Sequence, residues 1–379
     1  MVAVTEEVLA AAGTAMGGRV LRPMTQLRSS SRSAVLRASV DDGPDTVIVK
    51  TYDLSNDPEA WLRESASLYI ARGCRAPALV ADVAQPPLVV LEDLGTGTSV
   101  ADALLRGDAD TATSAVREWA TSLASLHTAT VRTGDAFADA LASRAGTARD
   151  TVTAVPAVDS MPGMLDRSSA MLAEFVSALG ITTSPRISSE LRHATEAFDP
   201  TAVALTPADA CPDNNISTVD GLKLLDFERA TVRAVAWDLA YLTVPWPSCW
   251  CCWRIPEEVA ATALTAWRER VAPALPHVAT PAFERELAVA TTAWAVVTCA
   301  WFLPRAARKF RFTDSSDHPA PTVRAALQHR LGIAVTSGAT VLPALASLAE
   351  QALGATRRLW GDEPLEHAPA FRHPAPRPR

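Results

Sequence analysis

The stretch that decides the fold is Thr206-Pro207-Ala208-Asp209-Ala210-Cys211-Pro212-Asp213-Asn214-Asn215, followed after a turn at Asp220-Gly221 by Leu222-Lys223-Leu224-Leu225-Asp226-Phe227-Glu228. It contains a carboxylate at Asp209, an amide five residues later at Asn214, and a second carboxylate, Asp226, at the end of an apolar run. Phosphoryl transfer from ATP needs this set, because one carboxylate must orient the attacking hydroxyl while an amide oxygen and another carboxylate hold Mg²⁺. A hairpin between Asn215 and Asp226 would bring the two metal ligands together.

Short apolar runs typical of β-strands fill the first 95 residues. They span residues 19–27, 33–40, 45–52, 78–83 and 88–91. Lys50 lies in the third run, and Asp57 and Pro58 begin a helical pattern in which we expect Asp57 to be the N-cap. Glu64 lies on this helix, fourteen residues after Lys50. A Lys–Glu pair of this kind holds an ammonium against nucleotide phosphates, so we predict that Lys50 and Glu64 bind a nucleotide.

Two further segments of this region are candidates for nucleotide binding. The run from Leu88 to Gly95 is a strand that leaves into a new part of the chain, where the backbone at Glu92 and Leu94 could bind an adenine edge. Ser30 and Ser31 lie between the first two strands, where a loop covering phosphates would sit. This loop lacks the usual glycines, so it supports a phosphate cradle only weakly.

Beyond Gly95 the sequence turns to long Ala- and Leu-rich segments with helical periodicity. They cover residues 111–129, 137–148, 164–179, 184–198 and 257–359. The sequence therefore predicts an α+β protein with two lobes: a small antiparallel β lobe at 1–95 with a hinge at its end, and a large, mainly helical lobe at 96–360 that carries catalysis and substrate. We expect the Pro-rich residues 361–379 to be disordered.

Composition excludes some classes of partner. Lys and Arg total 35 against 42 Asp and Glu, a net charge of −7, which argues against nucleic acid as the main partner. The six cysteines are too few for a disulfide scaffold and predict reduced thiols in the cytoplasm. The N-terminal residues carry acids where a signal peptide needs a basic region, so we expect no signal peptide. The apolar run at 287–303 contains three threonines, so we expect a buried helix rather than a membrane span.

The ordered set of motifs resembles the aminoglycoside phosphotransferase and choline kinase-like family, which consists of small-molecule kinases with a protein-kinase-like fold. The family pattern His-Gly-Asp-x-x-x-x-Asn, then Asp-Phe-Glu, then Asp-Leu-Ala, is similar to 207–214, 226–228 and 238–240 of this chain. The runs Leu91-Glu92-Asp93-Leu94-Gly95 and Ser125-Leu126-His127 are also similar to family stretches. The resemblance covers about residues 19 to 300 and implies a bilobal protein-kinase-like fold.

The resemblance also implies roles. Asp209 would be the catalytic base, Asn214 and Asp226 would bind Mg²⁺, and Lys50, paired with Glu64, would contact the phosphates of ATP. The implied reaction moves the γ-phosphoryl of ATP to a hydroxyl of a small molecule: an antibiotic such as an aminoglycoside, an amino alcohol such as choline, or a sugar. By the same resemblance Asp238 would be a structural acid. The acceptor and the oligomeric state stay open at this stage.

One departure from the family pattern keeps an alternative in view. Pro207-Ala208 replaces the His-Gly pair, and proline offers no donor to tie the loop into the lobe. The alternative function is a catalytically weak nucleotide-binding pseudokinase with a regulatory or scaffold role. Against it, the charged and metal-binding positions named above all survive. The segment 245–253, with three Trp and three Cys, predicts either core packing or a wall of the substrate pocket, and its spacing does not favour a zinc site.

Overall fold

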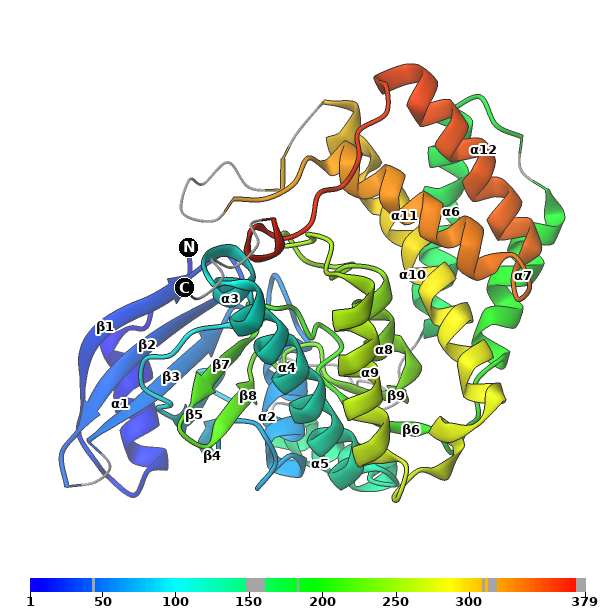
Figure 1. Cartoon of the computed structure of the whole chain (residues 1–379). Helices are drawn as coiled ribbons and strands as arrows, with labels where there is room; N and C mark the ends of the chain where they lie inside the picture. The colour runs from blue at the N-terminus through cyan, green and yellow to red at the C-terminus, as the bar shows by residue number, and fades with distance from the viewer. Residues whose placement is uncertain (43–44, 148–160, 183, 309–310, 313–318, 373–379) are drawn as a thin grey trace, which may run out of the picture.

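The computed structural model describes residues 1–42, 45–147, 161–182, 184–308, 311–312 and 319–372. A twisted sheet and two helices form the N-terminal lobe, and the remaining helices form a larger lobe beside it (Figure 1). The predicted α+β architecture, with a small antiparallel β lobe followed by a mainly helical lobe, is confirmed.

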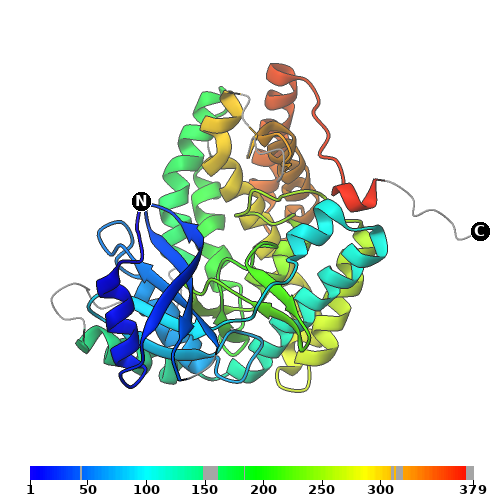
Figure 2. The ribbon, with the colours of Figure 1, turned by 90° about the vertical axis from the view of Figure 1, so that its left-hand side faces the viewer.

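The N-terminal lobe is built on a five-stranded antiparallel sheet in the order β1-β2-β3-β5-β4. Its strands are β1 (Leu21–Ser29), β2 (Ser33–Val40), β3 (Thr46–Tyr52), β4 (Leu79–Val83) and β5 (Leu88–Glu92). Helix α1 (Glu6–Ala15) packs on one face of this sheet, and α2 (Ala60–Ile70) lies on the side of the larger lobe (Figures 1 and 2).

The alternation of β3 decides where its lysine points. Val47 and Val49 pack in the same apolar cluster as α1, whereas Tyr52 packs in the cluster that contains α2. Successive side chains of a strand point to opposite faces, so Lys50 emerges on the face of Tyr52. This register places the lysine toward α2 and the larger lobe.

The beginning of α2 differs from the sequence prediction. The helix starts at Ala60, and its N-cap residue Glu59 makes no side-chain capping bond. Asp57, predicted to be the N-cap, is buried and accepts a hydrogen bond from Arg229 at 2.6 Å, with Arg32 at 3.6 Å. The prediction was wrong because two arginines from distant segments pair with this carboxylate.

The larger lobe is a helical bundle whose main apolar cluster continues into the sheet lobe through residues such as Trp61 of α2 and Val89 of β5. Its helices are α3 (Val100–Arg106), α4 (Ala109–Thr130), α5 (Gly134–Thr147), α6 (Met161–Ala178), α7 (Pro185–Glu196), α8 (Ala236–Thr243), α9 (Glu257–Val271), α10 (Pro281–Ala307), α11 (Val323–Gly338) and α12 (Pro343–Trp360), with short 3₁₀ turns at Pro276–Ala279 and Pro369–Phe371. Helix α10, which contains the apolar run, packs against α6, α8 and α11. It is long and apolar enough to cross a membrane, but 72% of its most apolar window is buried in the protein, as a core helix is.

Two short β-ribbons interrupt the helices and carry the deciding stretch. Strand β6 (Val203–Thr206) pairs with β9 (Thr231–Ala234), and β7 (Asn215–Thr218) pairs with β8 (Gly221–Leu224) in an antiparallel hairpin. The N–H of Leu225 donates to the carbonyl of Asn214 at 2.9 Å, which extends the hairpin toward Asp226. The predicted hairpin is therefore confirmed.

The C-terminal segment corrects another expectation. Residues 361–372, expected to be disordered, pack against the loop that precedes α9. Arg254 and Ala368 are joined by a backbone hydrogen bond of 2.8 Å, and the Arg372 guanidinium lies 4.5 Å from the ring centre of Trp253. Composition failed here because the segment is held by residues of other elements, among them Arg254 and Gln328, which its own residues do not indicate. Residues 373–379 fall outside the described residues.

His329 on α11 gives this region a predictable response to acid. Burial, together with Arg254, Arg330 and His367, lowers the pKa of His329 from 6.5 to about 4. Below about pH 6.5 the unfolded chain therefore binds a proton that the folded chain does not. The free energy of unfolding should fall as the pH drops from about 7 to 4, by up to about 3 kcal/mol for this group.

The His329→Gln variant should lose that part of the pH dependence. Urea unfolding at about pH 7 and about pH 4.5 would show a smaller difference for the variant than for the wild type. A His193→Gln control, at an exposed histidine of α7, should follow the wild type. Equal pH dependence in wild type and His329→Gln would contradict the assignment.

Candidate active site

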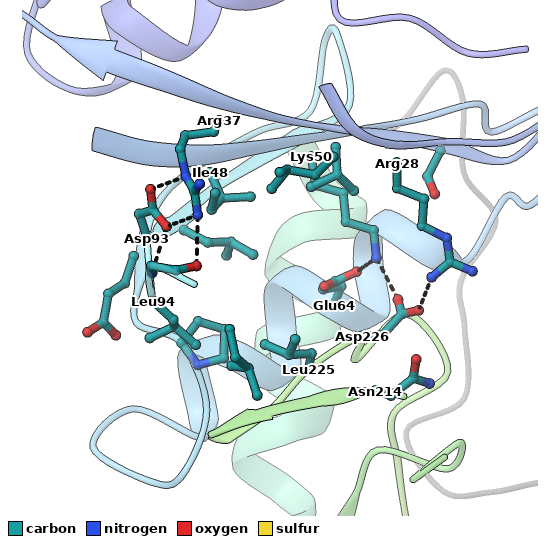
Figure 3. Close-up of a pocket in the computed structure, with 18 of the residues that line it drawn as sticks. Arg28, Arg37, Ile48, Lys50, Glu64, Asp93, Leu94, Asn214, Leu225 and Asp226 are labelled. Atoms are coloured by element: carbon teal, nitrogen blue, oxygen red, sulfur yellow. Dashed lines mark hydrogen bonds and ion pairs between the residues drawn. The ribbon is translucent and has the colours of Figure 1, made fainter. Parts of the chain in front are cut away.

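A cavity of about 240 Å³ lies between the sheet and the β7–β8 hairpin (Figure 3). Its walls are apolar over one part, formed by Val35, Ile48, Leu91, Leu94, Ile216 and Leu225. At the other end it is lined by charged and amide side chains, namely Arg28, Lys50, Glu64, Asn214 and Asp226. Such a slot, apolar at one end and charged at the other, suits a flat base followed by phosphates.

Lys50 is the centre of the charged end. Its Nζ lies 2.5 Å from Glu64 Oε2, 2.6 Å from Asp226 Oδ1 and 3.3 Å from Glu228 Oε2, and its side chain is only 7% exposed. Burial alone would lower the pKa of Lys50, but the carboxylates of Asp226, Glu64 and Glu228 outweigh it and raise that pKa well above its ordinary value. The lysine is therefore a fixed cation.

The partners of Lys50 are also held in place. The Tyr52 hydroxyl donates to Glu64 Oε2 at 2.7 Å. Burial raises the pKa of Glu64, although Lys50 opposes this. Burial also favours protonation of Asp226, but Lys50 and Arg28 outweigh it and hold the pKa of Asp226 below its ordinary value. Asp226 thus remains an anion at the wall of the cavity.

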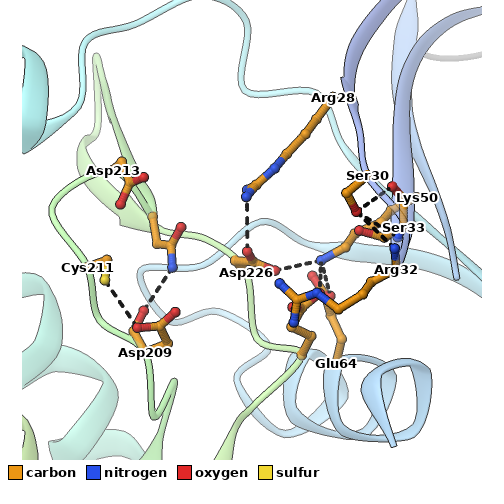
Figure 4. A network of polar contacts seen from close by, with 12 residues as sticks. Arg28, Ser30, Arg32, Ser33, Lys50, Glu64, Asp209, Cys211, Asp213 and Asp226 are labelled. Carbon is orange, nitrogen blue, oxygen red and sulfur yellow. Dashed lines mark hydrogen bonds and ion pairs between the residues drawn. The ribbon is translucent and has the colours of Figure 1, made fainter. Parts of the chain in front are cut away.

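Two arginines of the β1–β2 hairpin, which sequence reasoning did not identify, face the same cluster. Arg28 Nη1 lies 3.7 Å from Asp226 Oδ2, and Arg32 Nη1 lies 3.1 Å from Glu228 Oε1 (Figure 4). Their place beside the serine-rich turn was the available signal. Glu228, at the end of the deciding stretch, forms ion pairs with Lys50 and Arg32.

The serines of that turn serve the backbone. Ser30 Oγ accepts hydrogen bonds from the N–H groups of Arg32 and Ser33, each at 3.1 Å, and so shapes the turn. Ser31 lines a separate hollow near Tyr52. Among the described residues, the lining of the nucleotide-sized cavity includes Ser33 but neither Ser30 nor Ser31. The structure thus does not bring these two predicted side chains to the cavity.

The hinge after β5 forms the far end of the cavity. Glu92 and Leu94, whose backbone we expect at an adenine edge, both line it. The Glu92 carboxylate accepts hydrogen bonds from the N–H of Ala78 and from Lys223, both at 3.0 Å, so the backbone is what this residue offers to a ligand. Arg37 donates to Asp93 at 2.6 Å and to the carbonyl of Gly95 at 2.8 Å, and these bonds fix the hinge (Figure 3).

The loop that carries Asp209 and Asn214 lies on the hairpin side of the cavity, where, among the described residues, Asn214 belongs to the lining and Asp209 does not. Asn214 Nδ2 donates to the backbone carbonyl of Asp209 at 2.9 Å. Since its nitrogen is committed to that bond, the amide oxygen is the atom that Asn214 can offer to a cation. Asn214 and Asp226 both line the cavity, so the two predicted metal ligands are brought together despite their separation along the chain.

The loop that begins with Pro207-Ala208 is braced without a histidine. Trp119 Nε1 donates to the carbonyl of Ala210 at 3.0 Å, and the Tyr241 hydroxyl lies 3.4 Å from the carbonyl of Ala208. Ala208 occupies the place of the glycine in the family pattern and has φ +61°, in the left-handed region that favours glycine. The backbone thus keeps a shape made for glycine, although the residue is alanine.

Asp238 lies behind the loop in a closed network. Its carboxylate pairs with Arg233 and lies 3.2 Å from His127 Nε2. Trp267 Nε1 donates to the other ring nitrogen of His127 at 3.2 Å, which leaves Nε2 to donate to Asp238. Burial would raise the pKa of Asp238, but Arg233 and His127 hold it below its ordinary value. This geometry fits a structural acid.

The segment 245–253 both packs in the core and reaches the loop. Trp246 is buried, and so are the three cysteines of the segment, Cys249, Cys251 and Cys252. Trp250 Nε1 donates to Asp213 Oδ2 at 2.7 Å, and these two residues line a neighbouring hollow of about 400 Å³. Since Asp213 also lines the main cavity, the two spaces adjoin. Core packing of this segment is therefore confirmed, whereas its role as a wall of the substrate pocket stays a prediction.

The same segment brings Cys249 close to Cys211 and Asp213, a grouping that the spacing of the cysteines in the sequence did not predict. The sulfurs of Cys211 and Cys249 and a carboxylate oxygen of Asp213 lie within 4.8 Å of one another. These are possible ligands for a soft metal. However, burial raises the pKa of both thiols, and a protonated thiol is a poor ligand.

The fold that carries this cavity is similar to that of several solved structures. No family model and no curated protein sequence matches the chain. Among solved structures, the streptomycin–ATP ternary complex of APH(2″)-IIa covers 79% of this chain and 94% of its own, with a TM-score of 0.52 and 12% identity. The chain is also similar to a Plasmodium vivax ethanolamine kinase (87% and 84% covered, TM-score 0.49, 12% identity) and to a macrolide 2′-phosphotransferase of Brachybacterium faecium (86% and 98%, TM-score 0.49, 15% identity).

These neighbours are small-molecule kinases and phosphotransferases. The chain has the two-lobed fold of the aminoglycoside phosphotransferase APH(2″)-IIa, and the resemblance predicted from the sequence is confirmed at the level of the fold. At such low identity the likeness shows the fold alone, so the chemistry must be argued from the residues of the cavity.

The strained alanine of the loop makes a testable prediction. Ala208→Gly should stabilise the protein by about 0.5–1 kcal/mol, because glycine adopts a positive φ without the clash that alanine suffers. Ala210→Gly is the matched control. Ala210 is not one of the described residues with a positive φ, so this change should destabilise the folded protein. Urea midpoints measure both. A lower midpoint for Ala208→Gly would contradict the strained conformation.

Proposed function

We propose that this protein is an ATP- and Mg²⁺-dependent phosphotransferase that moves the γ-phosphoryl of ATP to a hydroxyl of a small molecule. The observation that carries the proposal is the charged end of the cavity, where Lys50, Asn214 and Asp226 line one space. Asp209 is joined to that space because its carbonyl holds the Asn214 side chain. These are the residue types that phosphoryl transfer requires.

The nucleotide would lie along the cavity. Its base would fit the apolar walls and meet the backbone at Glu92 and Leu94, in the hinge that Arg37 holds. Its phosphates would reach Lys50, whose ammonium is already oriented by Glu64. Arg28, on the β1–β2 hairpin, adds a second positive charge at this end. Ser33, beside the turn at Ser30 and Ser31, would be the contact of this turn with the phosphates, since it is the residue of the turn that lines the cavity among the described residues.

The donor set suits magnesium. The amide oxygen of Asn214 and the carboxylate of Asp226 are hard oxygen ligands, and Mg²⁺ is commonly held by one or two such side chains together with substrate phosphates. The ion would neutralise charge on the transferring phosphoryl group. The low pKa of Asp226 keeps this ligand ionised, and Lys50 supports the same region from the opposite lobe.

The acceptor would approach from the hollow beside Asp213. In this arrangement Asp209 orients the hydroxyl and accepts its proton late in the transfer. The acceptor classes are those of the resemblance: an aminoglycoside or another antibiotic, an amino alcohol, or a sugar. Two acidic side chains, Asp102 and Asp213, line the hollow with Trp250, and together with the net charge of −7 they favour a cationic acceptor.

A catalytically weak nucleotide-binding pseudokinase is the second candidate. The observation that favours it is the Pro207-Ala208 pair with its strained alanine. Against it stands the intact set of Lys50, Asn214 and Asp226 at one cavity. It predicts a rise in melting temperature with Mg·ATP but no phosphorylated product.

The direct test is an ATP-consumption screen over aminoglycosides, macrolide and peptide antibiotics, amino alcohols and sugars, with mass spectrometry to detect the added phosphoryl group. With an acceptor that is phosphorylated, Asp209→Asn should lower kcat by about two to four orders of magnitude, because the base is lost, while nucleotide affinity is largely kept. Asp220→Asn, at the exposed turn of the β7–β8 hairpin, is the matched control. No product from any acceptor, or full turnover in Asp209→Asn, would reject the proposal.

A further inference from the structure

Ser248, in the segment 245–253, contacts Asp209, the proposed catalytic base, although no sequence motif links the two residues. Its Oγ lies 2.6 Å from Asp209 Oδ1 and 2.8 Å from the hydroxyl of Tyr241, which lies on α8. Thirty-nine residues separate Ser248 from Asp209 along the chain. The contact therefore exists only because the segment 245–253 folds back onto the loop.

The chemistry of the partners sets the direction of these bonds. The Ser248 hydroxyl donates to the carboxylate oxygen Oδ1 of Asp209, which accepts. The Tyr241 hydroxyl then donates to the serine oxygen at 2.8 Å, and its 3.4 Å approach to the carbonyl of Ala208 is the longer contact of the same single proton. Tyr241 is fully buried, and the result is a one-way chain from Tyr241 to Ser248 to Asp209.

This chain of hydrogen bonds ends on one carboxylate oxygen of Asp209, Oδ1. Cys211 Sγ also lies 3.1 Å from Asp209 Oδ1, so two donors share this atom (Figure 4 shows the Cys211 contact). Because both donors meet Oδ1, an acceptor hydroxyl would approach Oδ2. A carboxylate held in this way has a fixed rotation, which in-line attack requires of its base.

The scaffold behind Ser248 is rigid. Trp246 is buried, has φ +45°, and packs edge-on against Trp119 with ring centres 5.2 Å apart. The N–H of Cys249 donates to the carbonyl of Trp246 at 2.9 Å. Trp119 in turn holds the carbonyl of Ala210. One indole thus fixes both the segment that carries Ser248 and the loop that carries Asp209.

We propose that Ser248, supported by Tyr241, is a positioning residue that fixes the carboxylate of Asp209 for attack by the acceptor hydroxyl. This inference rests on the proposed function. It also accounts for the absence of a histidine at position 207, since the loop is held from the segment 245–253 instead.

The test compares steady-state kinetics of variants, with ADP release from Mg·ATP and the acceptor that the wild type phosphorylates. Ser248→Ala should lower kcat by about 10- to 100-fold, the scale of a misplaced reacting group, with KM for ATP changed by less than about twofold. Ser248→Thr, which keeps the hydroxyl, should restore most of the turnover. Tyr241→Phe should lower kcat in the same direction but by less.

Ser168→Ala is the matched control, because Ser168 on α6 also holds a hydrogen bond with a side chain far along the chain: Trp301 Nε1 of α10 donates to its Oγ at 3.3 Å. It should keep the wild-type kcat. If Ser248→Ala does not fold, Tyr241→Phe decides: reduced kcat at unchanged KM supports the inference, and wild-type kcat overturns it. Wild-type kcat in a folded Ser248→Ala overturns the positioning role alone, whereas a wild type without any phosphorylated product overturns the proposed function.

Discussion

The packing of the two lobes depends on the buried ammonium group of Lys50. Lys50 is nearly inaccessible to solvent, and a buried charge costs several kcal/mol unless partners compensate it. Compensation comes from both lobes: Glu64 on α2 belongs to the sheet lobe, and Asp226 and Glu228 follow the β7–β8 hairpin. Since no single element supplies all three carboxylates, the lobes must pack in one arrangement to satisfy the lysine. The same pairing keeps Asp226 ionised, so the constraint that orders the lobes also prepares an anionic ligand.

A second constraint is the loop that carries Asp209. Proline cannot donate a hydrogen bond, so Pro207 cannot brace the loop as a histidine would, and Ala208 holds a backbone shape that suits glycine. The chain compensates with aromatic side chains from other helices. Trp119 on α4 and Tyr241 on α8 contact the loop carbonyls. A broken motif therefore coexists with an intact cluster of charged groups, because the brace and the chemistry use different residues.

Local patterns predicted most of the fold and the core of the site. Alternation and helical periodicity gave the strands and helices, and the placement of Lys50 before a helix with Glu64 predicted their ion pair, which the structure contains. Contacts between distant segments were not readable. Arg229 pairs with Asp57 from a position 172 residues away in the sequence. The prediction that Asp57 caps α2 was therefore wrong. Ser248 contacts Asp209 only because of the conformation of a Trp- and Cys-rich segment, whose composition indicated packing but not its partner.

The most direct test of the account is a crystal structure with Mn²⁺ in place of Mg²⁺ and a non-hydrolysable ATP analogue, with anomalous scattering to locate the metal. The account predicts one manganese peak bonded to the amide oxygen of Asn214 and the carboxylate of Asp226, with the phosphates of the analogue against Lys50. A nucleotide bound elsewhere, or a peak that contacts neither Asn214 nor Asp226, would contradict the claim that these residues form a site for phosphoryl transfer.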